Sequence, residues 1–488
     1  MDFDHLTNIM SASGAPAPSD ASYALSRAYA DSLDLHDPLS IFRSEFHIPT
    51  TADLASTCPP PASASIEPTH IPSPTCIYFC GNSLGLQPKR TAALINDELA
   101  IWATRGVTGH FRHPKSRPWV SIDENVSEHL AGIVGAKPSE VAAMGSLTGN
   151  IHLLLAGFYK PKENRYKVIM EGRAFPSDHY AIVSQLQWHG HTESSALVLI
   201  DPIAPYSTLT TNQILSTIDQ HADSTALLFL SGVQYYTGQA FDMATITKFA
   251  QSKGITVGWD LAHAAGNIEL KLHEWGVDFA VWCSYKYLNS GPGGIAGIFV
   301  HERHDLDSNT STPRHRLAGW WGHDRVTRFQ MDTQFLPLPG APGYQLSNPS
   351  VLDTTAHLAS LELFTKATPA ALQRKSRLLT SYLYVLLTHP PEGISDTLTS
   401  YYTILTPSAP SDRGAQLSIK FMKPGLMDRV LAKLTEKGVV VDERRPDVIR
   451  VAPVPLFNRY REVWVFGAGL WWECLGAGVS ELEKGEGL

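Results

Sequence analysis

Short apolar runs separated by polar, glycine-containing crossings fill the middle of the chain. Their length, flanking turn residues and lack of polar interruption favour buried strands. Strands are expected at the start of 166–182 and of 225–238, and over 197–202, 255–259, 278–284 and 295–300. Segments with helical spacing lie between them, for example from Lys89 to about Trp102. This alternation predicts an α/β fold with a mostly parallel sheet.

The pattern changes after Val351. Two helices are expected over 351–367 and 370–387, followed by strands near 401–408 and 415–422, a helix near 425–437, and two further strands. We interpret 351–488 as a smaller C-terminal α/β domain and 76–350 as the large domain. Residues 1–75 form an N-terminal segment in which 51–75, rich in Ala, Pro, Ser and Thr, are predicted to be a surface insertion.

Charge and composition exclude several classes of protein. The chain has 488 residues and a net charge of −8, which argues against nucleic acid or an anionic membrane as a partner. Its N-terminus lacks the basic and apolar regions of a targeting peptide, and no apolar run reaches the roughly 18 residues of a membrane span. The five cysteines form no CxxC pair, which fits a reducing, cytoplasmic location.

One lysine stands out in the crossing between the last two expected strands of the large domain. Lys286 lies between Tyr285 and Tyr287, directly after the run 278–284. Surrounding aromatic groups would desolvate the amine and disfavour its charged form, leaving a neutral nucleophile. A surface lysine that extends over two tyrosines is an equally good interpretation of this stretch alone.

An acidic residue ends the preceding expected strand. Asp260 follows the run 255–259, and His263 comes three residues later. Such an acid often caps the next helix. Pyridoxal phosphate (PLP) chemistry, however, needs a lysine to hold the aldehyde and a carboxylate to keep the pyridine nitrogen protonated. Asp260 and Lys286 could supply this pair.

Further polar and aromatic groups occur where apolar runs end, and ligands in open α/β sheets bind at the carboxyl ends of the strands. These residues are Ser146, Thr148, Phe175, Asp178, Ser231 and Tyr236. Hydroxyls and free N–H groups at a helix start can hold a phosphate, although Thr148 could simply cap its helix. Asp178 could likewise cap a helix or reach a cofactor. Arg450, inside an apolar strand, needs an anionic partner, either a substrate carboxylate or a structural acid.

Seven segments together resemble the kynureninase family, whose members are fold-type I PLP enzymes of the class V aminotransferase group. They are GNSLGLQPK (81–89), RAFPSDHYAI (173–182), SGVQYYTGQ (231–239), WDLAHAAGN (259–267), SYKYLNSGPGG (284–294), GWWGH (319–323) and IRVAPVPLFN (449–458). They occur in a consistent order over most of the chain.

The resemblance implies roles for individual residues. The cofactor-binding set would be Leu147, Thr148, Phe175, Pro176, Ser177, Asp178, Ser231, Tyr236, Asp260, His263, Tyr285, Lys286, Trp320 and Asn348. The substrate-binding set would be Ser83, His110, Trp321, Asn348 and Arg450. It also implies a homodimer, with Trp320 contributed across the interface. Trp321 stands where the family also uses Phe, which leaves room for a changed aryl pocket.

The implied activity is hydrolysis of L-kynurenine and 3-hydroxy-L-kynurenine to anthranilate or 3-hydroxyanthranilate plus L-alanine, in tryptophan degradation and de novo NAD synthesis. Lys286, Tyr285 and Asp260 would be the catalytic residues, with no metal. His110 and Asn348 could bond a ring hydroxyl, so we expect a preference for the 3-hydroxy substrate.

Two other functions are weighed against this one. A class V cysteine desulfurase needs a catalytic cysteine on a mobile loop, and no cysteine occurs between Cys283 and Cys474. A non-catalytic PLP-fold protein would lack some of Lys286, Asp260 and Arg450, whereas all three are present.

Overall fold

The computed structural model describes residues 1–56, 73–205, 207–305, 314–331 and 333–486. The chain forms two compact units. The central unit comprises Pro88–Gln373 and Ser411–Gly414, and the terminal unit comprises Met1–Gln87, Arg374–Pro410 and Ala415–Leu488. Most of the predicted insertion, residues 57–72, lies outside the described residues.

A seven-stranded sheet forms the core of the central unit, in the order β2-β8-β7-β6-β5-β3-β4. Its strands are β2 (Val141–Ala143), β3 (Lys167–Glu171), β4 (Leu197–Ile200), β5 (Thr225–Ser231), β6 (Thr256–Asp260), β7 (Phe279–Trp282) and β8 (Gly297–Val300). The neighbours from β4 to β7 pair in parallel, and only β8 runs antiparallel to both of its neighbours. The predicted mostly parallel α/β sheet is therefore confirmed.

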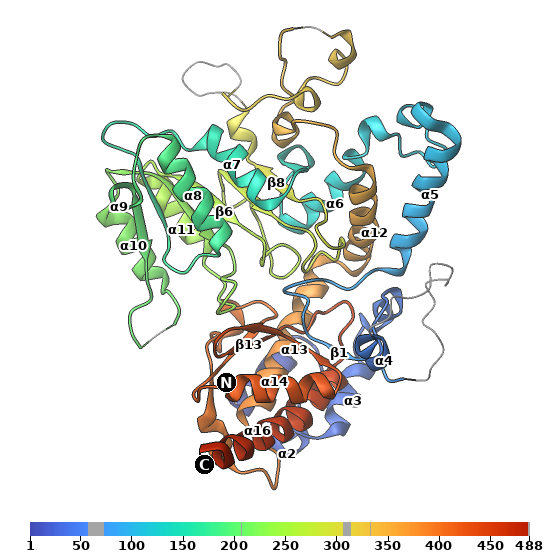
Figure 1. Ribbon diagram of the computed structural model, residues 1–488, viewed down its shortest axis with the longest axis vertical. Helices are drawn as coiled ribbons and strands as arrows, with labels where there is room; N and C mark the ends of the chain where they lie inside the picture. Colours follow the sequence, from blue (N-terminus) through green and yellow to red (C-terminus); the bar gives the residue numbers. More distant parts are fainter. Residues whose placement is uncertain (57–72, 206, 306–313, 332, 487–488) are drawn as a thin grey trace. The chain divides into compact units, whose positions relative to one another are not determined.

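Helices cover both faces of this sheet (Figure 1). On one face, alternate residues of β5, Leu227 and Phe229, share a core with α7 (Leu147–Phe158) and α8 (Pro176–Trp188). On the other, Trp259 Nε1 of β6 donates to Thr247 Oγ1 of α11 (Met243–Ser252) at 3.0 Å, and α10 (Thr211–Gln220) packs on α11. Burial on both faces explains why the strands are continuously apolar.

Three more helices of the central unit pack together beside β2. They are α5 (Lys89–Arg105), α6 (Glu124–Val134) and α12 (Val351–Ala367). The helix α12 begins at a Ser350 cap, whose hydroxyl accepts the Asp353 N–H.

The terminal unit has a four-stranded antiparallel sheet in the order β12-β13-β10-β9 and a parallel pair, β1-β11. The strands are β1 (Ile77–Tyr78), β9 (Tyr402–Ile404), β10 (Leu417–Phe421), β11 (Val439–Val440), β12 (Asp442–Arg444) and β13 (Val448–Val451). Its main helices are α1 (Phe3–Ala12), α3 (Arg27–Leu35), α13 (Pro369–Thr388), α14 (Leu426–Glu436) and α16 (Trp471–Glu486), of which α13 begins in the central unit.

The N-terminal residues belong to the core of the terminal unit. Leu6 and Tyr29 are buried in one cluster with Tyr382 and Trp471. The strand β1 pairs with β11 of the same unit, and the helix 351–367 packs within the central unit. The two compact units thus meet in the sequence near residues 87 and 373, whereas the sequence analysis predicts domain borders near 75 and 350. Where the functional domain borders lie stays a prediction.

Candidate active site

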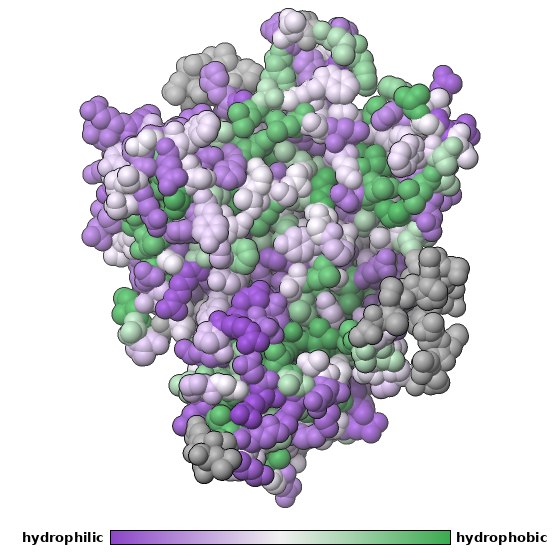
Figure 2. Space-filling view, in the orientation of Figure 1, coloured by the Kyte–Doolittle hydropathy of each residue, from purple (hydrophilic) through white to green (hydrophobic). Residues whose placement is uncertain are grey.

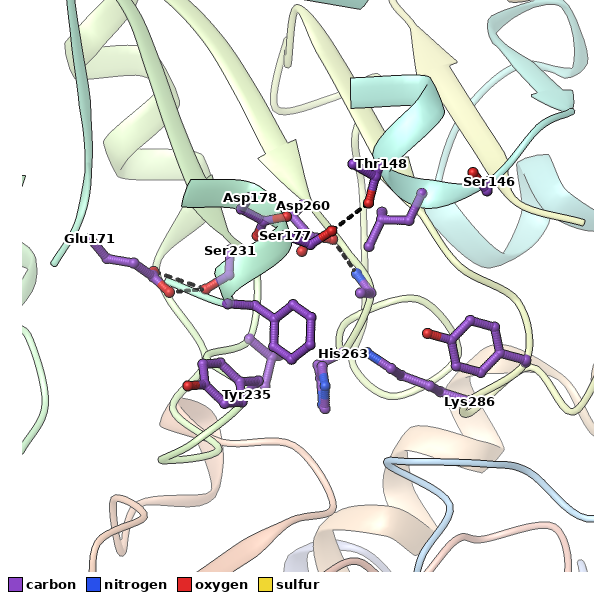
Figure 3. Close-up of a pocket in the computed structure, with 15 residues that line it drawn as sticks. Ser146, Thr148, Glu171, Ser177, Asp178, Ser231, Tyr235, Asp260, His263 and Lys286 are labelled. Atoms are coloured by element: carbon purple, nitrogen blue, oxygen red, sulfur yellow. Dashed lines mark hydrogen bonds between the residues drawn. The ribbon is translucent and has the colours of Figure 1, made fainter. Parts of the chain in front are cut away.

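A pocket lies at the carboxyl edge of the central sheet, where β3, β5 and β6 end in Glu171, Ser231 and Asp260. Parallel strands bring their carboxyl ends to one edge, which explains why residues distant in sequence meet here. The other lining residues are Ser146, Leu147, Thr148, Phe175, Ser177, Asp178, Val233, Tyr235, Ala262, His263, Tyr285 and Lys286. Figure 3 shows these side chains from the separate elements that carry them.

Two helix starts meet at one side of the pocket. The helix α7 begins at Leu147 without a side-chain cap, so Thr148 does not act as the capping residue. Its hydroxyl bonds instead to Ser177 in the first turn of α8, with 2.5 Å between the two Oγ atoms (Figure 3). The first N–H groups of a helix have no intrahelical partner and attract anions. This arrangement can hold a phosphate.

The sharp entry into α7 depends on Gly145. Its φ is +57°, and a Cβ at this position would lie 2.5 Å from Asn150 Oδ1. The Asn150 amide is itself fixed by a bond to the Met144 carbonyl at 2.8 Å. A side chain at residue 145 would therefore disturb the turn that leads into α7.

Lys286 lies in a loop that is tied back to the end of β7. The loop returns through the Ser284 and Ser290 hydroxyls, 2.6 Å apart, and the Asn289 N–H donates to the Lys286 carbonyl at 3.1 Å. Lys286 Nζ lies 5.9 Å from the ring centres of both Tyr285 and Phe175. Tyr287, expected as the second aromatic neighbour, is buried and packs beside His263.

Two buried carboxyl groups lie side by side in the pocket (Figure 3). Burial raises the pKa of both Asp178 and Asp260. The negative charge of Asp260 and the bond between the two groups raise the pKa of Asp178 further, whereas that bond and the charge of Lys286 oppose the rise at Asp260. Asp178 is therefore the group that holds a proton, and Asp260 is the group that ionises first.

Asp260 is fixed by its own turn, because Oδ1 accepts the Ala262 N–H at 2.7 Å. Asp178 does not cap α8: its Oδ1 is buried and has no hydrogen-bond partner among the described residues. A buried acceptor of this kind indicates room for a donor from a bound molecule.

Tyr285 stays a neutral phenol at physiological pH. Burial is the main cause that raises the pKa of its hydroxyl, and the nearby Cys283 is a smaller one. It can therefore offer a proton or a hydrogen bond near Lys286.

Four residues of the pocket, Glu171, Val233, Tyr235 and Ala262, were not predicted from the sequence, and two of them are polar. Glu171 is fully buried, and burial raises its pKa to about 7. The sequence did carry a signal for Glu171, since a charged residue at the end of the apolar run of β3 suggests a functional side chain. Tyr235, rather than its predicted neighbour Tyr236, lines the pocket. Sequence alone does not tell which of two adjacent tyrosines in an irregular turn faces inward.

Several predicted residues of the central unit do not line the pocket. Pro176 is the first residue of α8, and Asn348 is exposed. Trp320 is 47% exposed, and Trp321 is buried against the guanidinium of Arg328, 4.3 Å from the ring centre. His110 packs edge-on against Trp119. Their proposed roles stay predictions.

The other two predicted substrate ligands belong to the terminal unit. Ser83 follows β1, and its N–H donates to the Cys80 carbonyl at 3.0 Å. Arg450 is buried in β13 and contacts Asp442 Oδ1 through Nε at 3.0 Å and Nη2 at 2.8 Å. The anionic partner that the sequence required is thus present within the protein.

Comparisons with known proteins agree with this arrangement. The family model for the kynureninase C-terminal domain matches residues 372–470, and the model for aminotransferase class-V matches 98–391. Kynureninase of Coccidioides immitis is 52% identical over 94% of this chain and 96% of its own length. The chain belongs to the kynureninase family. Kynureninase 1 of Emericella nidulans is 54% identical over 93% of this chain and 94% of its own.

Solved structures with the same fold are more distant from this kynureninase-family chain. The cysteine desulfurase CsdA of Escherichia coli has a TM-score of 0.65 at 15% identity, covering 91% of this chain and 98% of its own. A cysteine desulfurase of Thermococcus onnurineus NA1 has a TM-score of 0.64 at 18% identity, covering 84% and 95%. At these identities the likeness concerns the fold alone, and it confirms the predicted fold-type I architecture.

The cofactor of this family is PLP, and the pocket fits it. The start of α7 suits the phosphate, Asp260 suits a protonated ring nitrogen, Phe175 can stack on the ring, and Lys286 supplies the amine. The four described cysteines are free and buried; Cys58 lies outside the described residues. Among the described residues, no helix has the length and apolar character that crossing a membrane requires.

Proposed function

We propose that this chain hydrolyses L-kynurenine and 3-hydroxy-L-kynurenine, releasing anthranilate or 3-hydroxyanthranilate together with L-alanine. The observation that carries the proposal is the meeting of Lys286, Asp260 and the α7 start in one pocket, in a chain more than 50% identical to kynureninases over most of its length. When bound, PLP supplies an electron sink for the bonds that are broken at the substrate.

The residues of the pocket divide the work of proton transfer. Lys286 Nζ takes the proton from the substrate α-carbon and can return it. Asp260 keeps the cofactor ring nitrogen protonated, and the hydrogen bond from Asp178 favours the charged form of Asp260 that this role requires. Tyr285 holds its hydroxyl proton and can donate it near the γ-carbonyl, where water adds before the Cβ–Cγ bond breaks.

Binding of the substrate is assigned by the family resemblance. Arg450 would bind the α-carboxylate bidentately and so orient the α-carbon–hydrogen bond. Ser83, His110, Trp321 and Asn348 would shape the remainder of the substrate site. Tyr236, Trp320 and Asn348 remain proposed cofactor ligands.

A homodimer is proposed as the working form. An aromatic cluster lies exposed on the central unit: Phe329 is 50% exposed and packs 5.6 Å from the ring of Phe111 and 5.4 Å from that of Trp320. Figure 2 shows hydrophobic residues on the visible face of this unit, where Figure 1 draws α5 and α12. Exposed apolar clusters of this kind favour protein interfaces.

The proposed setting is the cytoplasm, in tryptophan degradation and de novo NAD synthesis. Its support is the kynureninase relationship and the absence of cysteine pairs spaced like a disulfide framework.

Product identification tests the activity. Purified protein loaded with PLP should convert each kynurenine to its anthranilate and alanine in equal amounts, measured by chromatography and mass spectrometry. We expect the higher kcat/KM for the 3-hydroxy substrate. Release of sulfide and alanine from cysteine, with no product from either kynurenine, would favour the desulfurase alternative instead.

A further inference from the structure

A carboxylate and two imidazoles converge at a second place in the central unit. Glu140 ends a 3-10 turn (Pro138–Glu140), His273 lies in the connection between β6 and β7, and His301 directly follows β8. One ligand atom of each lies within 4.8 Å of those of the other two. The cluster is separate from the PLP pocket, and none of the three residues lines that pocket.

The donor atoms have the spacing of a metal site. His273 Nδ1 is 2.9 Å from Glu140 Oε1, and His301 Nδ1 is 3.5 Å from the same oxygen. The two imidazole rings stack 4.9 Å apart at 23°. Ligands about 2.0–2.2 Å from a zinc ion lie a little over 3 Å from one another, so the three atoms could surround one ion with small movements.

The hydrogen bonds around His301 show that its Nδ1 can act as a metal ligand. The Arg303 N–H donates to His301 Nδ1 at 3.2 Å, so this nitrogen carries a lone pair rather than a proton. The same nitrogen faces a carboxylate oxygen, which is also an acceptor. An imidazole nitrogen has one lone pair, so an ion bound by His301 Nδ1 would replace the Arg303 N–H and lie next to the negative carboxylate oxygen.

The carboxylate is held in place from behind. Glu140 is buried, and its oxygens accept the N–H groups of Lys137 and Glu302, each at 2.9 Å. Such supporting bonds orient metal ligands in proteins. The His273 side chain is 36% exposed, so an ion and a water ligand can reach the cluster from solvent.

The nearby cations are engaged elsewhere. Lys137 Nζ binds Glu302 at 2.6 Å, and the Arg303 guanidinium binds Asp278 at 2.6 Å. Their charges are thus partly compensated, which lowers the repulsion that a divalent ion would meet.

We propose that Glu140, His273 and His301 form a binding site for a divalent transition-metal ion of the zinc class. Two imidazole nitrogens and one carboxylate oxygen are the ligands that zinc takes in open sites, where water fills the fourth position. The ion would link three segments that are far apart in the sequence, and it has no part in the proposed kynurenine chemistry.

Titration of the PLP-loaded protein with Co²⁺, followed by Zn²⁺ competition, tests the proposal. We expect one Co²⁺ per chain with a visible absorption typical of nitrogen and oxygen ligands, lost on adding Zn²⁺. His273→Gln and His301→Gln should each weaken binding by more than about tenfold, since changes to supporting residues alone cost 10–100-fold. Kynurenine turnover should be unchanged in both variants, which also shows that they fold.

His179→Gln is the matched control. His179 lies 3.3 Å from Glu193 in a surface pair that has no second histidine, so its loss should leave the Co²⁺ affinity unchanged. Equal affinities in the wild type and the His273→Gln and His301→Gln variants would overturn the proposal. So would a thiolate charge-transfer band, or no binding below millimolar Co²⁺.

Discussion

The Ser231 hydroxyl donates to both carboxylate oxygens of Glu171, with Oγ 3.0 Å from Oε1 and 2.9 Å from Oε2. Both residues end neighbouring parallel strands and line the pocket. Burial raises the pKa of Glu171 to about 7. The bonds from Ser231 oppose this rise, and the charge of Asp260 adds to it. Glu171 thus titrates near neutral pH, beside two other buried carboxyl groups, Asp178 and Asp260, whose pKa values burial also raises.

Glu171→Gln should change how stability depends on pH. The Glu171 pKa is higher in the folded chain (about 7) than its ordinary 4.5, so the folded state binds the proton more tightly. Its contribution to stability is full below pH 4.5 and is lost as pH rises to 7, by roughly 3 kcal/mol. The Tm difference between Glu171→Gln and wild type should therefore shift in favour of the variant from pH 5 to pH 7.5. The exposed Glu163→Gln is the control, and a difference that is the same at both pH values would contradict the assignment.

The position of the site was predictable because it follows from strand polarity. Asp260 and Ser231 end apolar runs, and Lys286 follows one, so a parallel sheet brings all three to one edge. The start of α7 was predicted from its own residues, because Ser146 and Thr148 offer hydroxyls where an apolar helix begins. The direct bond between Thr148 and Ser177 was not, because it joins two helices that are separate in sequence.

Long-range packing accounts for the remaining differences. The strand β2 has three residues, too few for a periodic pattern, and it exists because β8 supplies its hydrogen bonds. Residues 21–35 form two short helices, α2 (Ala21–Ala24) and α3, because the Ser26 hydroxyl accepts the Tyr29 N–H and so caps the start of α3. Tyr29 then packs on Tyr382, 353 positions away in sequence, and no local pattern reports such a contact.

Lys286→Ala should abolish the covalent link to PLP. Borohydride reduction followed by mass spectrometry should find PLP attached to the wild type and not to this variant, because the loop offers no other amine in the pocket lining. The exposed Lys248→Ala is the control and should retain the label. PLP that stays attached at full yield in Lys286→Ala would show that Lys286 is not the residue that forms the covalent link.

Arg450→Ala separates substrate binding from structural pairing. If Arg450 binds the α-carboxylate, a lost charge-assisted bond of roughly 1.5–3 kcal/mol should lower kcat/KM by about tenfold or more, with PLP retained. Asp442→Asn removes the charge of one protein partner of the same guanidinium, and asparagine keeps the shape of the aspartate side chain. Kinetics and thermal unfolding of both variants decide the matter. Equal losses of stability and activity in the two would assign Arg450 to the ion pair alone.

Mixed dimers test whether Trp320 serves the site of a partner subunit. Within one chain Trp320 is half-exposed, and its Nε1 donates to the Arg328 carbonyl at 3.0 Å. It does not line the pocket that holds Lys286.

Lys286→Ala and Trp320→Ala should each be nearly inactive alone. After mild dissociation and reassociation, half of the dimers should be mixed, and each of these has one site with both residues intact. Activity should then rise to about a quarter of the wild-type value. Trp320→Ala mixed with Trp320→Phe is the control for reassociation itself. If Trp320 acts within its own subunit, every site in the Lys286→Ala and Trp320→Ala mixture lacks one residue, and no activity returns.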